Sequence, residues 1–187
     1  MLVERMIRAA RLDPELYHEL VRDWYANGQA FLVVLIVLAC ALIGLGLPAL
    51  LFLISPVGWR HLFEFVLKFV GDWLFWVFVA QLVGMRYGSR ADFEHLLRPV
   101  GFAYTPGVLR IFTLVPGLFQ PIGTIVLLWT GVAKVLAIRE AMQFPTGKAV
   151  LITVLTTVIV AVIEALVCYL SGQAVSLGGL LLFPFGR

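Results

Sequence analysis

The chain has 187 residues, 61% of them hydrophobic and only 13% charged, and its mean hydropathy is +1.00. A soluble domain is nearer half apolar and a quarter charged, and one small core cannot hide so much apolar surface. The composition therefore excludes an ordinary soluble domain and predicts an all-α, polytopic transmembrane helical bundle of about five spanning helices. The net charge of +3 comes from basic residues near predicted helix ends. Membrane topology explains their position there, so we expect no nucleic-acid partner.

Residues 1–29 are predicted to form a cytoplasmic amphipathic arm. Apolar residues recur at helical spacing over residues 2–12, with arginines on the opposite side. Such a helix either lies on an anionic leaflet or packs against its own bundle, and the sequence favours neither. Asp13 is a suitable N-cap and Pro14 suits the first helical position, so a second short helix is predicted from there to about Tyr25.

The transmembrane bundle is predicted over residues 30–171, with Gly and Pro residues at the turns. Its expected spanning helices are 30–54, 59–85, 107–115, 121–142 and 148–170. The first half of the second segment is polar enough to be an amphipathic lead-in. Residues 86–105 are predicted to be the main polar loop, and residues 172–187 an apolar C-terminal tail.

Lysine and arginine residues divide unequally between the two ends of such a bundle. With five crossings, one end carries Arg5, Arg8, Arg11, Arg22, Arg86, Arg90, Arg98, Arg139 and Lys148. The other end carries Arg60, Lys68 and Arg187. Because these residues are enriched on the cytoplasmic side, we predict a cytoplasmic N-terminus, a cytoplasmic 86–106 loop and a C-terminus outside.

Four charged side chains are predicted to lie within the apolar helices, namely Asp72, Arg110, Lys134 and Glu164. A charge in hydrocarbon is costly and normally finds a partner. At ~1.5 Å per residue, Arg110 and Glu164 lie at similar depth, and Asp72 and Lys134 match each other nearer the middle. We predict two intramembrane ion pairs that fix helix register, Arg110–Glu164 and Asp72–Lys134. The alternative is an ion or proton path.

The last predicted helix carries a stripe of small residues spaced four apart. The stripe consists of Ala149, Thr153, Thr157, Ala161 and Ala165. Small residues at this spacing allow close helix approach, and threonine hydroxyls can bond to a neighbour. We interpret the stripe as a helix-packing surface, whose neighbour belongs either to this chain or to a partner.

Enzymatic chemistry has little support in the sequence. The three histidines are scattered, the two cysteines lie apart in apolar runs, and none of the common nucleotide, zinc, haem or hydrolase motifs is present. We expect no catalytic residue, no cofactor and no metal. Several aromatic residues are predicted to lie in interfacial belts: Trp59, Trp73, Trp76, Trp129 and Tyr104.

A family resemblance covers most of the chain, from about residue 10 to 170. It is carried by Phe93 to Pro106, Pro116, Leu128-Trp129, Ala137-Ile138-Arg139-Glu140 and Lys148-Ala149. These segments resemble Yip1-domain membrane proteins of the prokaryotic type, which often begin with a short helical arm. The resemblance implies a five-helix fold with a cytosolic N-terminus in a prokaryotic cell membrane. The DLYGP-like motif of the eukaryotic branch is absent, so that branch's role in Rab-dependent vesicle trafficking does not follow.

Three functions remain open at this point. The first is a non-enzymatic membrane scaffold or adaptor that acts through helix–helix contacts with other membrane proteins or with itself, by way of the fifth helix. The second is a small transporter or channel that uses the intramembrane charges. The third is an accessory subunit of a larger membrane complex. Besides the lipid bilayer, the sequence identifies no partner.

Overall fold

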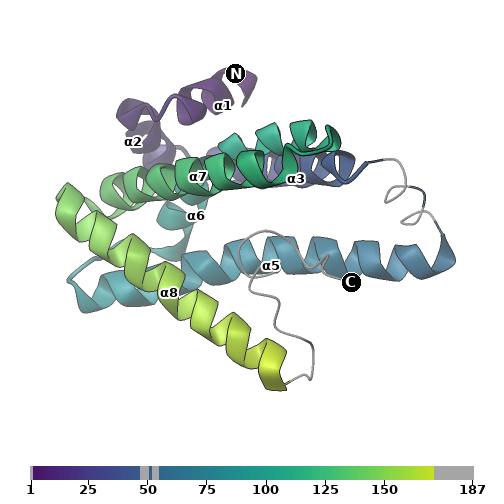
Figure 1. Cartoon of the computed structure of the whole chain (residues 1–187). Helices are drawn as coiled ribbons and strands as arrows, with labels where there is room; N and C mark the ends of the chain where they lie inside the picture. Colours follow the sequence, from purple (N-terminus) through teal and green to yellow (C-terminus); the bar gives the residue numbers. More distant parts are fainter. Residues whose placement is uncertain (1, 47–50, 52–54, 171–187) are drawn as a thin grey trace.

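Every element of the described chain is a helix (Figure 1). The structure is a computed structural model, which describes residues 2–46, 51 and 55–170. The main elements are α1 (Leu2–Ala10), α2 (Pro14–Arg22), α3 (Ala26–Gly44), α5 (Pro56–Arg86), α6 (Phe93–Ala103), η1 (Thr105–Leu114), α7 (Phe119–Met142) and α8 (Thr146–Leu170). The predicted fold class, an all-helical polytopic membrane bundle, is confirmed. The tail predicted over residues 172–187 lies outside the described residues.

The predicted N-terminal arm consists of α1 and α2, and it packs against its own bundle. Met6 and Ala9 of α1 and Tyr17 of α2 are buried. The indole Nε1 of Trp129, on α7, donates a hydrogen bond to the Ala10 carbonyl at 2.9 Å. Of the two arrangements that the sequence left open, the structure has the arm on the bundle.

The junction between α1 and α2 is closed by local polar contacts. The Asp13 carboxylate accepts a hydrogen bond from the Glu15 backbone N–H at 3.0 Å, and Pro14 lies in the first turn of α2. Arg8 forms ion pairs with Asp13 at 2.7 Å and with Glu19 at 3.0 Å. An N-cap and a fork of charge-assisted bonds therefore hold the two short helices at a fixed angle.

Four of the described helices, α3, α5, α7 and α8, are long and apolar enough to cross a membrane. The segments predicted at 121–142 and 148–170 begin two residues after α7 and α8 do, and the one at 121–142 also ends with its helix. The first predicted segment, 30–54, corresponds to α3, which ends at Gly44. Apolar composition over ~20 residues predicts such helices well because a spanning helix must bury all of its backbone hydrogen bonds internally.

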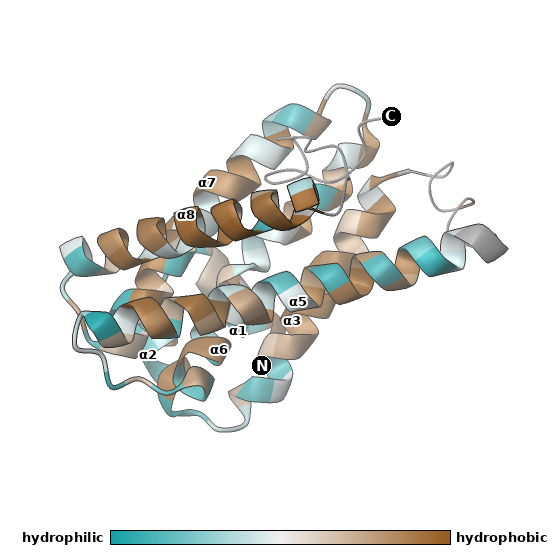
Figure 2. Ribbon diagram, turned by 90° about the horizontal axis from the view of Figure 1, so that it is seen from below, coloured by the Kyte–Doolittle hydropathy of each residue, from teal (hydrophilic) through white to brown (hydrophobic). Residues whose placement is uncertain are grey.

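The predicted lead-in and second crossing form one continuous helix, α5. It has 31 residues, about 46 Å at the usual rise, which exceeds the hydrocarbon thickness of a bilayer. Ser55 caps it by accepting a hydrogen bond from the Gly58 N–H at 3.1 Å. Side chains four residues apart form contacts along its polar half, including an Arg60–Glu64 ion pair at 2.9 Å. Figure 2 shows the polar residues toward this N-terminal half and the apolar residues beyond it.

The predicted polar loop over residues 86–105 is wrong in its second half, because residues 93–103 form α6. The predicted helix 107–115 forms instead as the 3-10 helix η1, and the two pieces meet at Tyr104. Glu94, His95 and Arg98 lower the hydropathy of α6, although the Arg98 side chain is buried. Polarity therefore suggested a solvated loop where the structure has a packed helix.

Helix α6 and η1 together run beside α3 in the same direction. The Arg98 guanidinium bonds Asn27 near the start of α3, and the Thr113 hydroxyl bonds the Gly44 carbonyl at its end. Between them, Gly101 lies against Ala30, where a built Cβ would be 2.8 Å from the alanine Cβ. The chain thus passes five times between the two ends of the bundle, and α6 with η1 provides the third passage.

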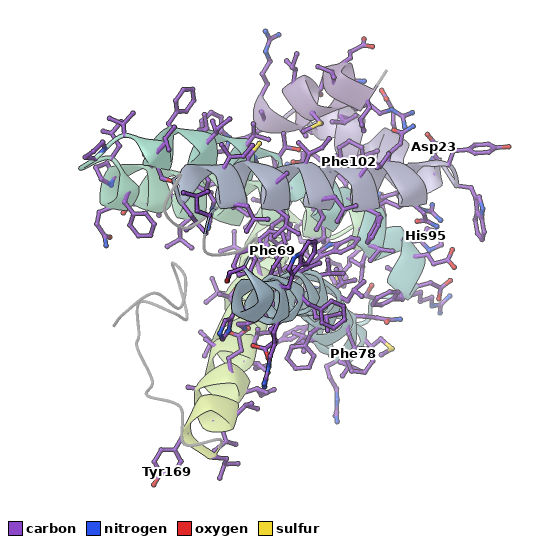
Figure 3. The ribbon with its side chains drawn as sticks, turned by 90° about the vertical axis from the view of Figure 1, so that its right-hand side faces the viewer. Asp23, Phe69, Phe78, His95, Phe102 and Tyr169 are labelled. Atoms are coloured by element: carbon purple, nitrogen blue, oxygen red, sulfur yellow. The ribbon has the colours of Figure 1, made fainter. Side chains whose placement is uncertain are left out.

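The helices form two groups around a buried core (Figure 1). α3, α6, η1 and α7 lie together beneath the arm, while α5 and α8 cross on the other side. Trp73 and Trp76 of α5 are buried in the core between them. The prediction that these two tryptophans lie in an interfacial belt is therefore wrong, and Figure 3 shows Phe69 of the same helix facing the α3 group.

Candidate functional site

A cavity of about 290 Å³ lies among α3, α5, η1, α7 and α8. All four charged residues that the sequence placed within apolar helices line it, and Lys68 joins them. We refer to it as the central cavity, defined by Lys68, Asp72, Arg110, Lys134 and Glu164. These residues come from four different elements, and the fold brings them to one cavity.

Asp72 lies in an ion pair on its own helix. The Lys68 ammonium is 2.9 Å from the Asp72 carboxylate, one turn earlier on α5. Both side chains are about half exposed, so the pair lies at the rim of the central cavity rather than at its base. An i,i+4 pair of this kind neutralises the aspartate within one helix.

The Lys134 ammonium lies between two aromatic rings. Its Nζ is 4.4 Å from the centroid of the Trp76 ring and 4.6 Å from that of Tyr104. The Trp76 indole N–H in turn donates to the Thr157 hydroxyl of α8 at 3.4 Å. Ring faces attract a cation most strongly where water is excluded, so Trp76 and Tyr104 help to hold the Lys134 ammonium in place inside the bundle.

Arg110 reaches the cavity from η1, whose position is set by close contact with α3. A Cβ at Gly44 would collide with the Arg110 backbone carbonyl, and the Thr113 hydroxyl donates to the Gly44 carbonyl at 3.0 Å. Glu164 lines the opposite wall from α8 and experiences the charges of Asp72, Lys68 and Lys134. The Arg110–Glu164 and Asp72–Lys134 pairs stay predictions.

The small-residue stripe of α8 faces the interior of this chain over most of its length. Thr153, Thr157 and Ala161 line the central cavity, and Ala149 is fully buried. The hydroxyls of Thr153 and Thr157 donate to carbonyls one turn earlier, each at 2.8 Å. Ala165, at the end of the stripe, is partly buried. The neighbours of the cavity-lining part are therefore α5 and α7 of the same chain.

Several aromatic residues of the site were not singled out from the sequence as parts of it. Phe65, Phe69 and Trp76 lie on the face of α5 that carries Lys68 and Asp72. Their spacing of four and seven residues, which places them on one face of a helix, is the signal that would have found them. Tyr104 could not be found in this way, because it lies where α6 gives way to η1.

No group of three or more His, Cys, Asp or Glu residues that could hold a metal occurs in residues 2–46, 51 and 55–170. The side chains that line the central cavity can interact with a ligand through charge, hydrogen bonds and aromatic contacts. Cations exceed carboxylates among its five charged residues. The arrangement suits the binding of an anion, or the holding of helices in register, better than acid–base catalysis by adjacent groups.

Comparison with known proteins agrees with this architecture. The model of the Yip1 domain family matches residues 12–168, from the end of α1 to the last turns of α8. No curated protein and no solved structure gives a significant match. The match covers the second helix of the arm, the five passages and every charged residue of the central cavity. The chain therefore belongs to the Yip1 domain family of integral membrane proteins.

Proposed function

We propose that this Yip1-domain protein is a non-enzymatic membrane scaffold or adaptor that binds other membrane proteins, or a second copy of itself, laterally through α8. Members of the family are generally non-enzymatic membrane trafficking proteins. The observation that carries the proposal is the exposure of α8. Only 22% of its spanning stretch is buried inside the protein, against 39% for α3.

The outer face of α8 is a regular apolar ridge. Val154, Val158 and Val162 are exposed and spaced four residues apart, so they lie one above another along the helix. Lipid covers such a ridge as well as a partner helix does, so apolarity alone does not distinguish a lipid-facing surface from a protein-binding one. The support comes from shape, because β-branched side chains in register form a rigid surface into which another helix can pack.

Site-specific photo-crosslinking in native membranes tests the proposal. A photoreactive residue at Val158 should give a defined protein adduct, while the matched control at Val132 should give mainly lipid adducts. Val132 lies on α7 and is similarly exposed. Equal adducts at the two positions, or none at Val158, would contradict lateral binding through α8.

A small transporter or channel is the second candidate, and the central cavity is the observation that favours it. Five charged side chains line it within a bundle of candidate spans. Liposomes that contain the purified protein should then pass protons or ions faster than empty liposomes, and Glu164→Gln should reduce that flux. The scaffold proposal expects no flux above the empty control.

The third candidate, an accessory subunit, requires a permanent partner. Purification in mild detergent separates it from the first candidate, because a subunit should remain in a complex of fixed stoichiometry, whereas a scaffold should be recovered largely alone or with a second copy.

A further inference from the structure

The N-terminal half of α5 begins two exposed ridges of opposite character. The polar ridge consists of Arg60, Glu64, Lys68 and Asp72, each four residues after the last. The apolar ridge consists of Phe63, Leu67, Leu74 and Phe78, which are all exposed. We infer that the apolar ridge faces lipid and the polar ridge faces water, so that the central cavity is a hydrated vestibule. It opens at the end of the bundle where α5 begins (Figure 1). The inference rests on neither candidate function, because it concerns only what surrounds α5.

The polar ridge leads from the outside of the bundle into the central cavity. Positions four residues apart on a helix are displaced by about 40° around its axis, so the ridge turns by about 120° between its first and last residues. Its first two residues lie outside the cavity, whereas Lys68 and Asp72 line it. The exposed fraction of the side chain falls along the ridge: 82% at Arg60, 53% at Glu64, 50% at Lys68 and 43% at Asp72. Because even Asp72 retains this exposure, the cavity is open to the outside beside α5.

The polar ridge ends at an aromatic turn. Four residues after Asp72 the same ridge position is occupied by Trp76, which is buried, as is Trp73 beside it. Trp76 contacts the Lys134 ammonium with its ring and donates to the Thr157 hydroxyl. Beyond this turn the inward face of α5 is apolar, with Val77 and Ala80 fully buried. The turn that carries Trp73 and Trp76 therefore marks the inner end of the vestibule.

The charges of the polar ridge make lipid an unsuitable neighbour for it. Arg60 pairs with Glu64 and Lys68 pairs with Asp72, each pair at 2.9 Å. Pairing alone does not repay the cost of taking two ions out of water, unless further hydrogen bonds satisfy their remaining donors and acceptors. Water supplies such bonds and hydrocarbon does not. Since residues 58–86 form a candidate span, the two ridges divide one stretch of helix between lipid and water.

The polar ridge suits water better than a charged ligand or a second copy of the chain. Cations and carboxylates alternate along it and are paired with each other, so an ion that approached it would meet both signs of charge. A second copy that docked with the valine ridge of α8 would cover these ion pairs with Val154, Val158 and Val162. Those side chains offer no hydrogen bond to an ion pair.

Labelling of cysteine variants tests the inference. The membranes are opened to give access from both sides, so the orientation of the protein does not enter, and Cys40 and Cys168 are replaced first. The reagent is a small charged methanethiosulfonate, which stays in water and reacts with the thiolate. Glu64→Cys is compared with Phe63→Cys, and Lys68→Cys with Leu67→Cys. The members of each pair are neighbours in the chain and differ in depth by only about 1.5 Å.

Each cysteine on the polar ridge should react about tenfold faster than its neighbour on the apolar ridge, because a thiol that faces hydrocarbon neither ionises readily nor meets the charged reagent. Rapid labelling of all four would show that this half of α5 stands in water. Protection of all four would show that lipid or protein covers both ridges. Either result overturns the inference.

A third pair tests whether water reaches the central cavity. Ala161 lines the cavity from α8, whereas Val162 is exposed on the outer ridge of that helix. Ala161→Cys should be labelled faster than Val162→Cys, whether lipid or a partner covers the outer ridge. Equal rates, or a faster rate at Val162→Cys, would show that water stops at the rim and would overturn the vestibule.

One further variant guards against misfolding. His61, exposed on α5 beside the polar ridge, lies 3.5 Å from Glu64, and His61→Cys retains both ion pairs. It should be labelled faster than Phe63→Cys even if Glu64→Cys or Lys68→Cys does not fold, which gel filtration in detergent shows. Equal rates at His61→Cys and Phe63→Cys would overturn the division of α5 between lipid and water.

Discussion

Arg98 joins three elements through one buried side chain. Its Nε donates to the Asn27 side chain at 2.7 Å, and its Nη1 donates to the Val21 carbonyl at 2.9 Å. Its guanidinium also lies 5.5 Å from the centroid of the Trp24 ring and 3.4 Å from Glu94. The side chain is only 4% exposed, so its charge is satisfied almost entirely by protein groups.

Arg98→Met should therefore be among the more damaging single substitutions outside the spans. It removes the bonds and leaves two partly buried acceptors without this donor, which should cost about 3 kcal/mol. That cost corresponds to a fall of about 6–12 °C in unfolding temperature for a chain of this size. Arg98→Lys should recover only part of the loss, because a lysine lacks the planar fork. Arg90→Met, at an exposed position, is the control, and a loss as large there would refute the assignment.

The sequence shows that an arginine is present at position 98, but it does not indicate that this arginine joins three elements. Its two main partners lie 71 and 77 residues earlier in the chain, and no local pattern connects residues so far apart. The intramembrane charges were easier to find, because a charge within an apolar run is conspicuous in any spanning segment.

Coupling between Arg110 and Glu164 is a second prediction at the residue scale. Glu164→Gln and Arg110→Met should each cost about 3 kcal/mol if they leave an unpaired charge. The double variant should recover about 1 kcal/mol or more of the summed loss. A parallel cycle with Lys134→Met serves as the comparison, since Lys134 also acts on Glu164. Additive losses with Arg110 and coupling with Lys134 would show that the predicted pair is wrong.

At the scale of elements, the fit of η1 against α3 depends on close contact at Gly44. A Cβ at Gly44 would meet the Arg110 carbonyl, which is backbone and cannot rotate away. Gly44→Ala should therefore destabilise the protein by about 1–3 kcal/mol. Gly28→Ala, in the same helix and with nothing near its Cβ, should be neutral or stabilising by up to about 1 kcal/mol. The unfolding temperatures of the two variants in detergent test this difference. An equal change in both would contradict the role of Gly44 in the contact between η1 and α3.

The packing of α1 against α2 should depend on pH through Arg8. Its guanidinium lowers the pKa of Asp13 and of Glu19 below their ordinary values, chiefly by hydrogen bonding. A lowered pKa in the folded state means that the stabilisation is complete above the ordinary pKa of about 4 and is lost as the pH falls through the lower folded value. Hydrogen exchange of residues 2–12, corrected for intrinsic rates, should accelerate between pH 5 and pH 3 by about an order of magnitude.

Arg8→Met is the control for this pH dependence. Residues 2–12 should exchange faster in the variant already at pH 6 and should change little as the pH falls. Acceleration of equal size in the variant would assign the effect to other carboxylates of the arm.

Caps and apolar run length predicted the start of α2 and the bounds of α7 and α8 to within two residues, because those signals are local. The end of α2 was predicted near Tyr25, and the helix ends at Arg22. The same signals failed for α6 and η1, where the third passage is stabilised by contacts with α3 rather than by its own composition. Pro99 within α6 and the Thr105-Pro106-Gly107 junction interrupt regular helix. Hydropathy therefore divided one passage into a loop and a short helix.

At the scale of the whole molecule, the number of passages decides where the ends of the chain lie. Four long helices alone would place both ends of the bundle segment on one side of the membrane. The parallel course of α3 and of α6 with η1 adds a fifth passage. We propose that this passage also crosses the membrane, so that the two ends lie on opposite sides. We propose that the arm faces the cytoplasm and the end of α8 faces outward in a prokaryotic cell membrane, as the excess of lysine and arginine at the arm's end indicates.

Cysteine labelling of intact cells tests this orientation. The reporter positions are Asp92, which is well exposed before α6 at the same end as the arm, and Tyr169, which is exposed at the far end of α8 (Figure 3). Each is changed to cysteine in a chain whose Cys40 and Cys168 have been replaced. An impermeant maleimide added outside should label Tyr169→Cys, and should label Asp92→Cys only after the membrane is opened.

Trp59→Cys, exposed at the start of α5, should behave as Tyr169→Cys does, because α5 begins at the end of the bundle where α8 finishes (Figure 1). Labelling of all three from outside, or of Asp92→Cys alone, would contradict the proposed orientation. If Trp59→Cys is labelled from outside while Tyr169→Cys and Asp92→Cys are both protected, the end of α8 does not reach the outer surface and the fifth passage is not a crossing.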